Sequence, residues 1–410
     1  MVSAKFKPVE EQLAYLKKGA AEIIREEELK EKLVESAKVG KPLRVKLGVD
    51  PTAPDIHLGH TMVLRKLKHF QDMGHTAIFL IGDFTAMVGD PSGQSETRPP
   101  LTREHVRKNV KTYLDQVYSI LDRKNTEVRY NSDWLAKLTA EEIIRLCAHY
   151  RLARMLERED FRSRIANNQP FSVHELLYPL LVAYDSVVLE ADVELGATEQ
   201  KFNLLVGRDI QREYGQPQQV AFTMPILVGL DGERKMSKSF GNYIGIREAP
   251  GEMFGKVMSI SDDLMWSYYE LLTDFPPPTI TRLRGEVRSG VLHPMNAKVQ
   301  LGHTIVAGFH GEEAARKAAE EFRLVFRDRK APTEIPEMRL GCGTRPLFAV
   351  LTETGLAASR SEAERLIKQG AVEVNGQVER EVKRMIVLNP GELVPLRVGK
   401  KKFLRVVGVS

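Results

Sequence analysis

Residues 43–60, LRVKLGVDPTAPDIHLGH, join an apolar stretch, a proline-rich turn and the start of a helix. The apolar part predicts a buried strand, and a helical pattern follows from about His57 to Met73, ended by Gly74. HTAIFLIGDF, residues 75–84, then predicts a second buried strand. A strand, helix and strand of these lengths form a right-handed crossover, so we expect an α/β fold with a Rossmann-like, doubly wound parallel sheet.

Periodicity in the rest of the chain divides it into further segments. The first forty residues read as charged amphipathic helix, residues 100 to 170 carry long helical patterns, and QVAFTMPILVGL, residues 219–230, predicts another buried strand. From about residue 246 the chain is helical again, interrupted by FPPPT. We expect a catalytic domain at 1–245, an α-helical domain at 246–330, a linker at 331–343 and a small α+β module at 344–410.

The C-terminal module has two local signals. SRSEAERLIKQG predicts a helix opened by Ser361, with Glu364 three residues later at the spacing of a capping box. Asn375 and Gly376 lie between alternating residues, and both favour the positive φ angles that a tight hairpin turn requires. The module is therefore predicted to contain a helix pair followed by a β-hairpin.

Composition is that of an ordinary folded protein, with 42% hydrophobic and 28% charged residues. No run approaches 18 apolar residues, and the N-terminus lacks the layout of a signal peptide, which favours a cytoplasmic location. Cys147 and Cys342 form no metal-ligand pattern, so no bound metal is expected. The net charge of +5 permits a polyanionic partner, and the basic tail from Arg397 to Arg405 suits phosphate contacts.

The HLGH tetrapeptide, residues 57–60, lies where the first strand passes into its helix. A helix N-terminus favours phosphate groups, and Gly59 lets an adenine or ribose approach the backbone. His57 and His60 share one helical face and can donate hydrogen bonds to phosphate oxygens, and Thr52 could add a hydroxyl donor. Taken alone, the same spacing also suits capping or core histidines.

The KMSKS pentapeptide, residues 235–239, lies in a polar segment between Gly232 and Gly241. Lys235 and Lys238 on a mobile loop can close on the β- and γ-phosphates of a nucleotide and neutralise the leaving pyrophosphate. A solvated basic loop is the alternative for such a short match. The two motifs together favour a nucleotide site.

HLGH followed by KMSKS resembles the paired signature of class I aminoacyl-tRNA synthetases. GDPSG, YPLLVAYDSVVLEADVELGATEQKFN and MPILVGLDGERKMSKS make nearly the whole chain similar to the bacterial tyrosyl-tRNA synthetase family. RPLFAVLTETGLAASRSEAERLIKQGAVEVNG is similar to the S4-type RNA-binding module of that family.

The resemblance implies a role for each matching residue. Asp185 accepts a hydrogen bond from a phenol hydroxyl, and Lys46 lies close to the same end of the substrate. Asp90 and Tyr178 hold the substrate ammonium, and Gln200 orients its carboxylate and the ribose. Asp50 completes the amino-acid site, whereas the ATP site includes Gly59, Met236, Glu199 and Lys238. The expected catalytic residues are His57, His60, Thr52, Lys235 and Lys238.

Two stretches of the sequence depart from the family pattern. Val182 stands where a glutamine usually binds the substrate amino group, and valine has no hydrogen-bonding atom. In GATEQ, Ala197 and Glu199 replace the residues of the usual GGTDQ. Either another group substitutes for the glutamine, or the pocket prefers a different substrate.

The resemblance implies a tyrosine-tRNA ligase that takes ATP with magnesium, L-tyrosine and tRNA(Tyr) as substrates, without a resident metal or organic cofactor and as a homodimer. An aminoacyl-adenylate forms first, and its acyl group then passes to the tRNA ribose. Three alternatives remain: a non-catalytic RNA-binding paralogue, another nucleotidyl transferase with a HxGH turn, and a class I synthetase for a different or modified aromatic amino acid.

Overall fold

The computed structural model describes residues 6–51, 55–92, 102–324, 336–399 and 402–409. The chain divides into two compact units, Met1–Phe309 and His310–Ser410. Within the described residues no helix is both long enough and apolar enough to span a bilayer.

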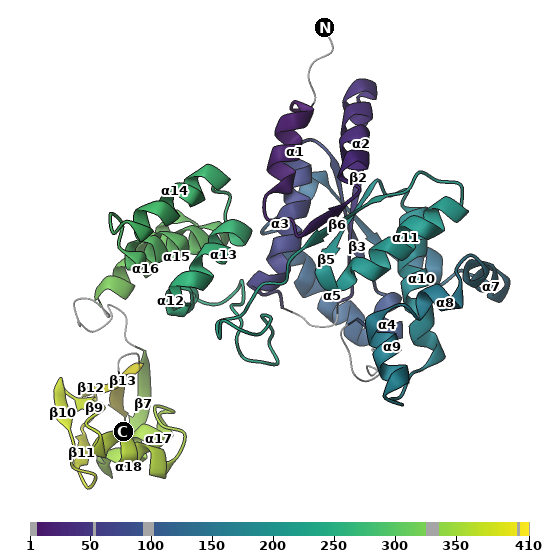
Figure 1. Ribbon diagram of the computed structural model, residues 1–410. Helices are drawn as coiled ribbons and strands as arrows, with labels where there is room; N and C mark the ends of the chain where they lie inside the picture. The colour runs from purple at the N-terminus through teal and green to yellow at the C-terminus, as the bar shows by residue number, and fades with distance from the viewer. Residues whose placement is uncertain (1–5, 52–54, 93–101, 325–335, 400–401, 410) are drawn as a thin grey trace. The chain divides into compact units, whose positions relative to one another are not determined.

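The first unit is built on a six-stranded sheet with the order β1-β6-β5-β2-β3-β4 (Figure 1). Its strands are β1 (Glu22–Ile24), β2 (Arg44–Val49), β3 (Thr76–Ile81), β4 (Thr126–Tyr130), β5 (Val193–Ala197) and β6 (Val220–Met224). All neighbouring strands are parallel except β1, which pairs antiparallel with β6. The predicted doubly wound parallel sheet is confirmed.

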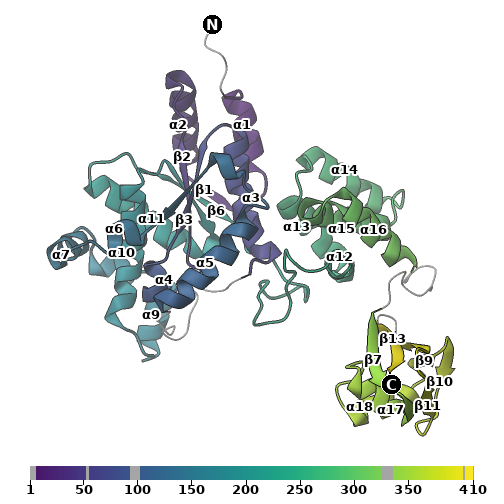
Figure 2. The same cartoon turned by 180° about the vertical axis from the view of Figure 1, so that it is seen from behind.

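The strand order reverses between β2 and β5. From β2 the chain steps to β3 and β4 on one side, whereas β5 and β6 extend the sheet on the other side. Right-handed crossovers therefore place α3 (Leu58–Asp72) and α11 (Lys201–Glu213) on opposite faces of the sheet. Figures 1 and 2 show the sheet from the two sides. A ligand site is expected at the carboxyl ends of β2 and β5, where the order reverses.

Two helices, α4 (Thr85–Val88) and α5 (Arg103–Val117), lie between β3 and β4. The long connection between β4 and β5 contains α6 (Ser132–Leu135), α7 (Ala140–Ala148), α8 (Leu152–Met155), α9 (Glu159–Ala166) and α10 (Val173–Val188). The largest interhelical contact is that of α10 with α11, and their apolar faces meet in a cluster that includes Leu180, Ala183, Val206 and Ile210. This packing fixes the face of α10 that points toward the sheet.

The helical reading of the first forty residues is confirmed for two helices and misses the edge strand between them. The segment forms α1 (Val9–Lys17), the edge strand β1 and α2 (Glu26–Val39). Gly19 has φ +66°, which ends the first helix, and residues 22–24 then pair with β6. The edge of the sheet, rather than local periodicity, decides this conformation.

The helical reading of residues 100 to 170 misses β4. TEVRY is half-buried along its whole length, because β4 is the outermost strand beside β3. An edge strand of this kind carries no continuous apolar run, so it gives little signal in the sequence.

Beyond the sheet, the first unit is helical, with α12 (Pro250–Ser259), α13 (Asp262–Leu272), α14 (Pro277–Arg288) and α15 (Pro294–His310). The interruption predicted at FPPPT is confirmed: α13 ends before it, and α14 begins at Pro277, whose fixed φ suits the first helical turn. The second unit opens with α16 (Glu312–Phe322).

The C-terminal module combines a five-stranded sheet, a two-stranded sheet and two helices. The sheet orders are β10-β9-β12-β13-β7 and β11-β8. The elements are β7 (Glu337–Gly341), β8 (Gly343–Pro346), α17 (Leu347–Glu353), α18 (Arg360–Lys368), β9 (Val372–Val374), β10 (Gln377–Glu379), β11 (Met385–Leu388), β12 (Leu393–Val398) and β13 (Lys402–Val409). One apolar cluster, including Leu347, Ile367 and Val406, forms its core.

Sequence expectations for this module hold in part. The hairpin turn is confirmed, with φ 53° at Asn375 and 77° at Gly376 between β9 and β10. The helix cap is wrong by two residues: Ser359 Oγ accepts from Glu362 N at 3.2 Å, and Ser361 lies inside α18. Residues 337–341 of the expected linker form β7, because β13 supplies a parallel partner. Residues 331–335 lie outside the described residues.

Candidate active site

A cavity of about 200 Å³ lies at the switch point of the sheet, between β2, β5 and α10. Seven of the residues expected in the site line it: Lys46, Asp50, Gly59, His60, Tyr178, Asp185 and Gln200. Val182, the departure from the family pattern, also lines it. The cavity therefore brings together residues that are up to 154 positions apart, from Lys46 to Gln200.

Asp185 is a buried carboxylate with a nitrogen donor at each oxygen. Trp134 Nε1 donates to Oδ1 at 2.8 Å, and Asn131 Nδ2 donates to Oδ2 at 3.1 Å. Burial raises the pKa of Asp185 to about 7, although Lys46 and these donors oppose the rise. The two donors fix the orientation of the carboxylate and leave its remaining lone pairs for a ligand.

Lys46 is fully buried and forms an ion pair with Glu194, at 2.8 Å between Nζ and Oε1. Its ammonium also donates to Ser186 Oγ at 2.8 Å and to the carbonyl of Val182 at 3.1 Å. Its three hydrogens thus all have protein partners. The ammonium offsets negative charge at this end of the cavity, and it donates its hydrogen bonds to residues of β5 and α10.

A second carboxylate, Asp50, follows β2 directly. Thr85 Oγ1 donates to its Oδ1 at 2.7 Å, and the Tyr178 hydroxyl donates to its Oδ2 at 3.0 Å. Burial raises the pKa of Asp50 to about 7. A side chain at Gly82 would collide with Asp50 and Thr85, so glycine is needed at this close approach.

Asp90 does not line the cavity itself but is joined to it by Gln200. Gln200 Nε2 donates to Asp90 Oδ2 at 2.7 Å, and Ser92 N donates to Asp90 Oδ1 at 2.9 Å. Arg158, also buried, donates to Ser92 Oγ at 2.7 Å and so stabilises the turn from Asp90 to Ser92. Asp90, Tyr178 and Gln200 are expected at one part of the site, and the structure shows the contact between Asp90 and Gln200.

The two histidines occupy the N-terminus of α3. His57 is the N-cap, and its Nδ1 accepts from Gly59 N at 3.2 Å; His60 Nδ1 accepts from His57 N at 3.2 Å. Because both Nδ1 atoms accept, the proton of each neutral ring lies on Nε2. Burial is the main reason why the pKa of His57 falls to about 3 and that of His60 to about 4. Each ring therefore offers one Nε2–H donor near neutral pH.

The KMSKS loop lies against this helix end. Leu58 N donates to Ile244 O at 2.9 Å, and Ile246 N donates to Ile56 O at 3.2 Å, so the chain after the loop pairs with the residues before α3. Lys238 Nζ lies 3.0 Å from Asp55 Oδ2, and Lys235 Nζ lies 2.8 Å from Glu199 Oε1. Two motifs about 180 positions apart thus form one surface.

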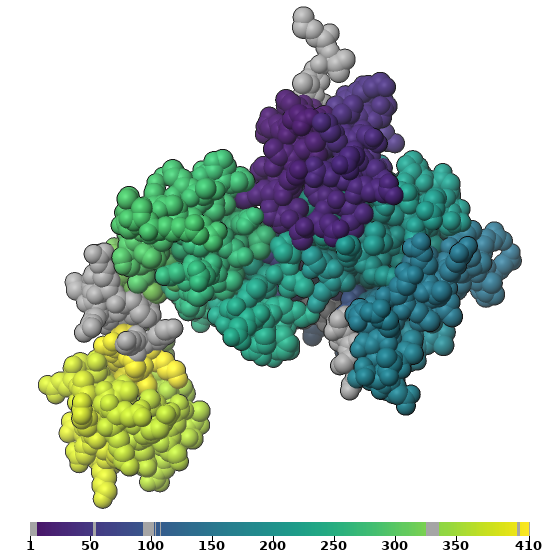
Figure 3. All heavy atoms as spheres, in the orientation of Figure 1, coloured from purple at the N-terminus to yellow at the C-terminus, as the bar shows by residue number. Residues whose placement is uncertain are grey.

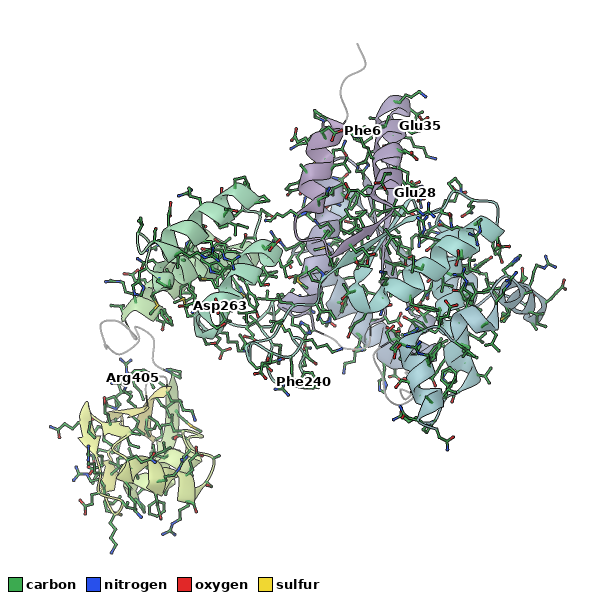
Figure 4. All side chains as sticks on the ribbon, in the orientation of Figure 1. Phe6, Glu28, Glu35, Phe240, Asp263 and Arg405 are labelled. Atoms are coloured by element: carbon green, nitrogen blue, oxygen red, sulfur yellow. The ribbon has the colours of Figure 1, made fainter. Side chains whose placement is uncertain are left out.

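Asn242 stabilises the KMSKS loop through side-chain hydrogen bonds. Its Nδ2 donates to Asp231 Oδ2 at 2.9 Å and to the carbonyl of Lys235 at 3.1 Å, and its Oδ1 accepts from Ser237 N at 2.9 Å. Asn242 is 5% exposed, as is Met236. By contrast, Phe240 is exposed at the outer side of the loop (Figure 4).

Some expectations lie outside the described residues or change in the structure. Thr52 lies outside them. Glu199, expected near a ribose, has Lys235 as its partner at 2.8 Å. The supporting residues that sequence reasoning missed are Asn131, Trp134, Thr85, Ser186, Glu194, Asp55 and Asn242. Recognising β4 would have pointed to Asn131, because it directly follows the carboxyl end of that strand.

Comparisons with known proteins agree with this arrangement. The family model "tRNA synthetases class I (W and Y)" matches residues 38–327, and the S4 domain model matches residues 345–389. The tyrosine–tRNA ligase of Oleidesulfovibrio alaskensis is 55% identical over 402 residues, which covers 97% of this chain and 99% of that protein. The tyrosine–tRNA ligase of Geobacter sulfurreducens is 54% identical over 400 residues, with the same two coverages.

Solved structures share the fold. The Archaeoglobus fulgidus tyrosyl-tRNA synthetase in complex with L-tyrosine has a TM-score of 0.62 at 24% identity and covers 76% of this chain and all of that one. A truncated mitochondrial tyrosyl-tRNA synthetase of Aspergillus nidulans has a TM-score of 0.63 at 20% identity, covering 78% of this chain and 99% of that one. Fold, paired motifs and full-length identity agree: the chain belongs to the class I tRNA synthetases of the tryptophan and tyrosine group, among the bacterial tyrosine–tRNA ligases.

Proposed function

We propose that this chain activates L-tyrosine with ATP and transfers the tyrosyl group to the terminal ribose of tRNA(Tyr). One observation carries the proposal: a single cavity has an oriented buried carboxylate, Asp185, on α10 and the Nε2–H donor of His60 at the N-terminus of α3. A phenolic amino acid needs a buried acceptor for its hydroxyl, and a triphosphate needs donors at a helix N-terminus.

The amino acid is bound by groups at the two ends of its side chain. The phenol hydroxyl donates to Asp185, beside the charge of Lys46. The substrate ammonium lies among Asp50, Asp90 and Tyr178, where carboxylates offset its desolvation. Gln200 bridges this anionic group and the substrate carboxylate. Phenylalanine is rejected because it would leave Asp185 buried without its ligand hydrogen bond.

ATP lies across the N-terminus of α3, with Gly59 and Met236 near its nucleoside and the histidines at its phosphates. The neutral rings donate through Nε2, and charge building up on the phosphates strengthens these bonds in the transition state. Lys235 and Lys238 leave Glu199 and Asp55 to bind the β- and γ-phosphates. A released Glu199 is then free to bind a ribose hydroxyl, and Thr52 adds a hydroxyl donor.

Magnesium enters with ATP as part of the substrate. The groups facing the phosphates are imidazoles and ammonium groups, whereas magnesium prefers carboxylate, phosphate and water oxygens. The residues proposed to face the phosphates therefore suit the nucleotide itself rather than a metal ion held by the protein.

The reaction has two steps. A carboxylate oxygen of tyrosine attacks the α-phosphorus, the bond from that phosphorus to the bridging oxygen breaks, and pyrophosphate leaves. A ribose hydroxyl of the tRNA then attacks the acyl carbon, and AMP leaves with the bonding electrons. The protein contributes positioning and electrostatic stabilisation, with no covalent intermediate.

The wider chain binds RNA and pairs with a second copy. In this proposal residues 1–245 catalyse, and residues 246–330 and the C-terminal module, which begins with β7, bind the tRNA. Large apolar side chains are exposed between α7 and α10, including Ile144 at 69%, Leu152 at 60% and Val173 at 77%. Such a surface favours a homodimer interface. We place the protein in the cytoplasm, where tRNA is charged.

Val182 keeps a second substrate possible. It lines the cavity, and its side chain offers no hydrogen bond to an amino group. The test is amino-acid-dependent exchange of pyrophosphate into ATP with L-tyrosine, phenylalanine, tryptophan, D-tyrosine and β-tyrosine. Exchange with L-tyrosine alone supports the proposal. Exchange with another member makes that amino acid the substrate, and no exchange in folded protein indicates a non-catalytic RNA-binding paralogue.

A further inference from the structure

A second cleft, of about 550 Å³, lies in the first unit away from the switch-point cavity. One wall is the turn after α1, with Lys17 and Lys18, and the other is α14, with Arg284 and Arg288. Glu270 is the one acidic residue among those that line it. The segment with α1 and the helices α13 and α14 lie side by side in Figures 1 and 3.

The two walls are held together by specific contacts. Lys18 Nζ donates to the carbonyl of Thr273 at 2.5 Å, just after α13. A side chain at Gly19 would meet Leu271 at 3.2 Å, so the turn packs closely on that helix. Behind the turn, buried Lys66 donates to the carbonyls of Leu16 and Lys18, at 2.6 and 2.8 Å. The cleft is therefore a built feature of the fold.

Its positive charge is incompletely neutralised. Lys17 pairs with Glu26 at the exposed outer side, at 2.7 Å. The side chains of Arg284 and Arg288 have no hydrogen bond or ion pair within the described part of the chain. They are four residues apart on α14, where like charges destabilise a helix. Arg282 on the same helix does have an acidic partner, Glu286, at 2.6 Å.

Two lysines beside the cleft have lowered pKa values. Burial lowers the pKa of Lys18 to about 8, with Asp274 and Glu270 opposing this effect and Arg65 adding to it. Burial also lowers the pKa of Lys66 to about 7, with Lys18 as the second cause. A bound anion would favour the charged form of Lys18.

We propose that this cleft binds backbone phosphates of an RNA strand, with Arg284 and Arg288 on one side and Lys17 and Lys18 on the other. Arginine suits phosphate because its planar guanidinium donates two parallel hydrogen bonds. Cations spread over two walls match successive phosphates better than one isolated anion. The inference rests on the proposed function, since the tRNA of that reaction is the RNA that the cleft contacts.

The test compares Arg284→Gln/Arg288→Gln with Arg282→Gln in the full chain. Binding of tRNA(Tyr) is measured by fluorescence anisotropy between about 50 and 200 mM salt, the range over which phosphate contacts lose strength. We expect the double variant to bind about 10- to 100-fold more weakly at low salt and to reduce the salt slope by about 2, one for each lost phosphate contact. Arg282→Gln should bind as the unaltered protein does.

Equal affinity and salt slope for the double variant and the unaltered protein would overturn the inference. The inference would also be overturned if inorganic phosphate shifted the side-chain NMR signals of Arg284 and Arg288 but the double variant bound tRNA(Tyr) as tightly as the unaltered protein. Pyrophosphate exchange, measured in parallel, separates the two proposals. Exchange that is normal in all three proteins leaves the amino-acid site intact, whereas absent exchange in the unaltered protein counts against the proposed function alone.

Discussion

Lys235 Nζ lies 2.8 Å from Glu199 Oε1, and this ion pair joins the KMSKS loop to the short helix that follows β5. Both side chains are partly exposed, at 42% and 37%. The lysine proposed to bind phosphate is therefore already near the nucleotide position, held by an acidic group that a triphosphate can replace. Asp55 holds Lys238 in the same way, at 3.0 Å.

Removing Lys235 should cost far more activity than removing Glu199. An exposed ion pair contributes at most about 1 kcal/mol, so Glu199→Gln is expected to change kcat/KM for ATP by less than about fivefold. Lys235→Gln removes a charge that acts on the transition state and should lower kcat by about 100-fold. Pyrophosphate exchange measures both. Lys201→Gln, which changes an exposed lysine paired with Glu22, is the control, and equal losses for Lys235 and Glu199 would contradict the assignment.

The Nε2–H of His60 should be the atom that matters at the N-terminus of α3. His60→Asn keeps an oxygen where Nδ1 accepts from His57 N but loses the distal donor. We expect kcat for pyrophosphate exchange to fall by about 100-fold with the KM for tyrosine unchanged. His60→Gln, which restores a distal N–H, should lose much less. If His60→Asn stays active while His60→Gln loses activity, the ring serves as a cap rather than as a donor.

Tyrosine affinity should decrease as the pH falls below 7. Burial raises the pKa of Asp185 to about 7, so its ionised, accepting form predominates above that pH and is lost below it. The KM for tyrosine should rise by about fivefold between pH 7 and pH 6, because the ionised fraction of a group with a pKa of about 7 falls from about one half to about one tenth. Trp134→Phe removes the 2.8 Å donor to Oδ1, disfavours the ionised form and should move this transition to higher pH.

Phenylalanine separates this effect from that of Asp50, whose pKa burial also raises to about 7. As a competitive inhibitor it lacks the hydroxyl, so the part of the pH dependence due to Asp185 should be missing from its inhibition constant. Identical pH profiles for tyrosine and phenylalanine would assign the whole effect to the ammonium side of the site.

Asn242 should position the KMSKS loop without touching substrate. Asn242→Ala removes its bonds to Asp231, Lys235 and Ser237, and we expect about 100-fold lower kcat, because the three bonds together contribute about 3 kcal/mol. Gly229→Ala should give the same phenotype, since its new methyl group would displace the Asn242 side chain. Hydrogen exchange in residues 231–241 should become faster in both, and unchanged exchange would remove Asn242 from this role.

Ser359, rather than Ser361, should stabilise the N-terminus of α18. Ser359→Ala should lower the opening free energy of residues 360–368 by about 1 kcal/mol, as loss of an N-cap does. Ser361→Ala lies within the helix and should change it by less than about 0.5 kcal/mol. Native-state hydrogen exchange in the full chain compares them. The opposite order would place the cap at Ser361.

The sequence by itself determined the features that depend on neighbouring residues or on two distinctive motifs. The strand and helix around HLGH, the turn at Asn375 and Gly376 and the break at FPPPT all follow from local conformational preferences, which tertiary contacts did not override. The pairing of HLGH with KMSKS identified the family because each motif restricts the chemistry of the other. Seven of the residues that line the cavity followed from the motifs and that resemblance.

Only the tertiary structure decided the features that depend on distant partners. Strands β1 and β4 exist because β6 and β3 offer edges for pairing, although neither has an apolar run of its own. The buried ion pair of Lys46 with Glu194 joins residues that are 148 positions apart. The partly exposed ion pair of Lys235 with Glu199 joins residues that are 36 positions apart. Sequence patterns report burial and local preference, whereas the partner of a polar side chain is set by how the elements pack, because each buried charge must find its counter-charge in space.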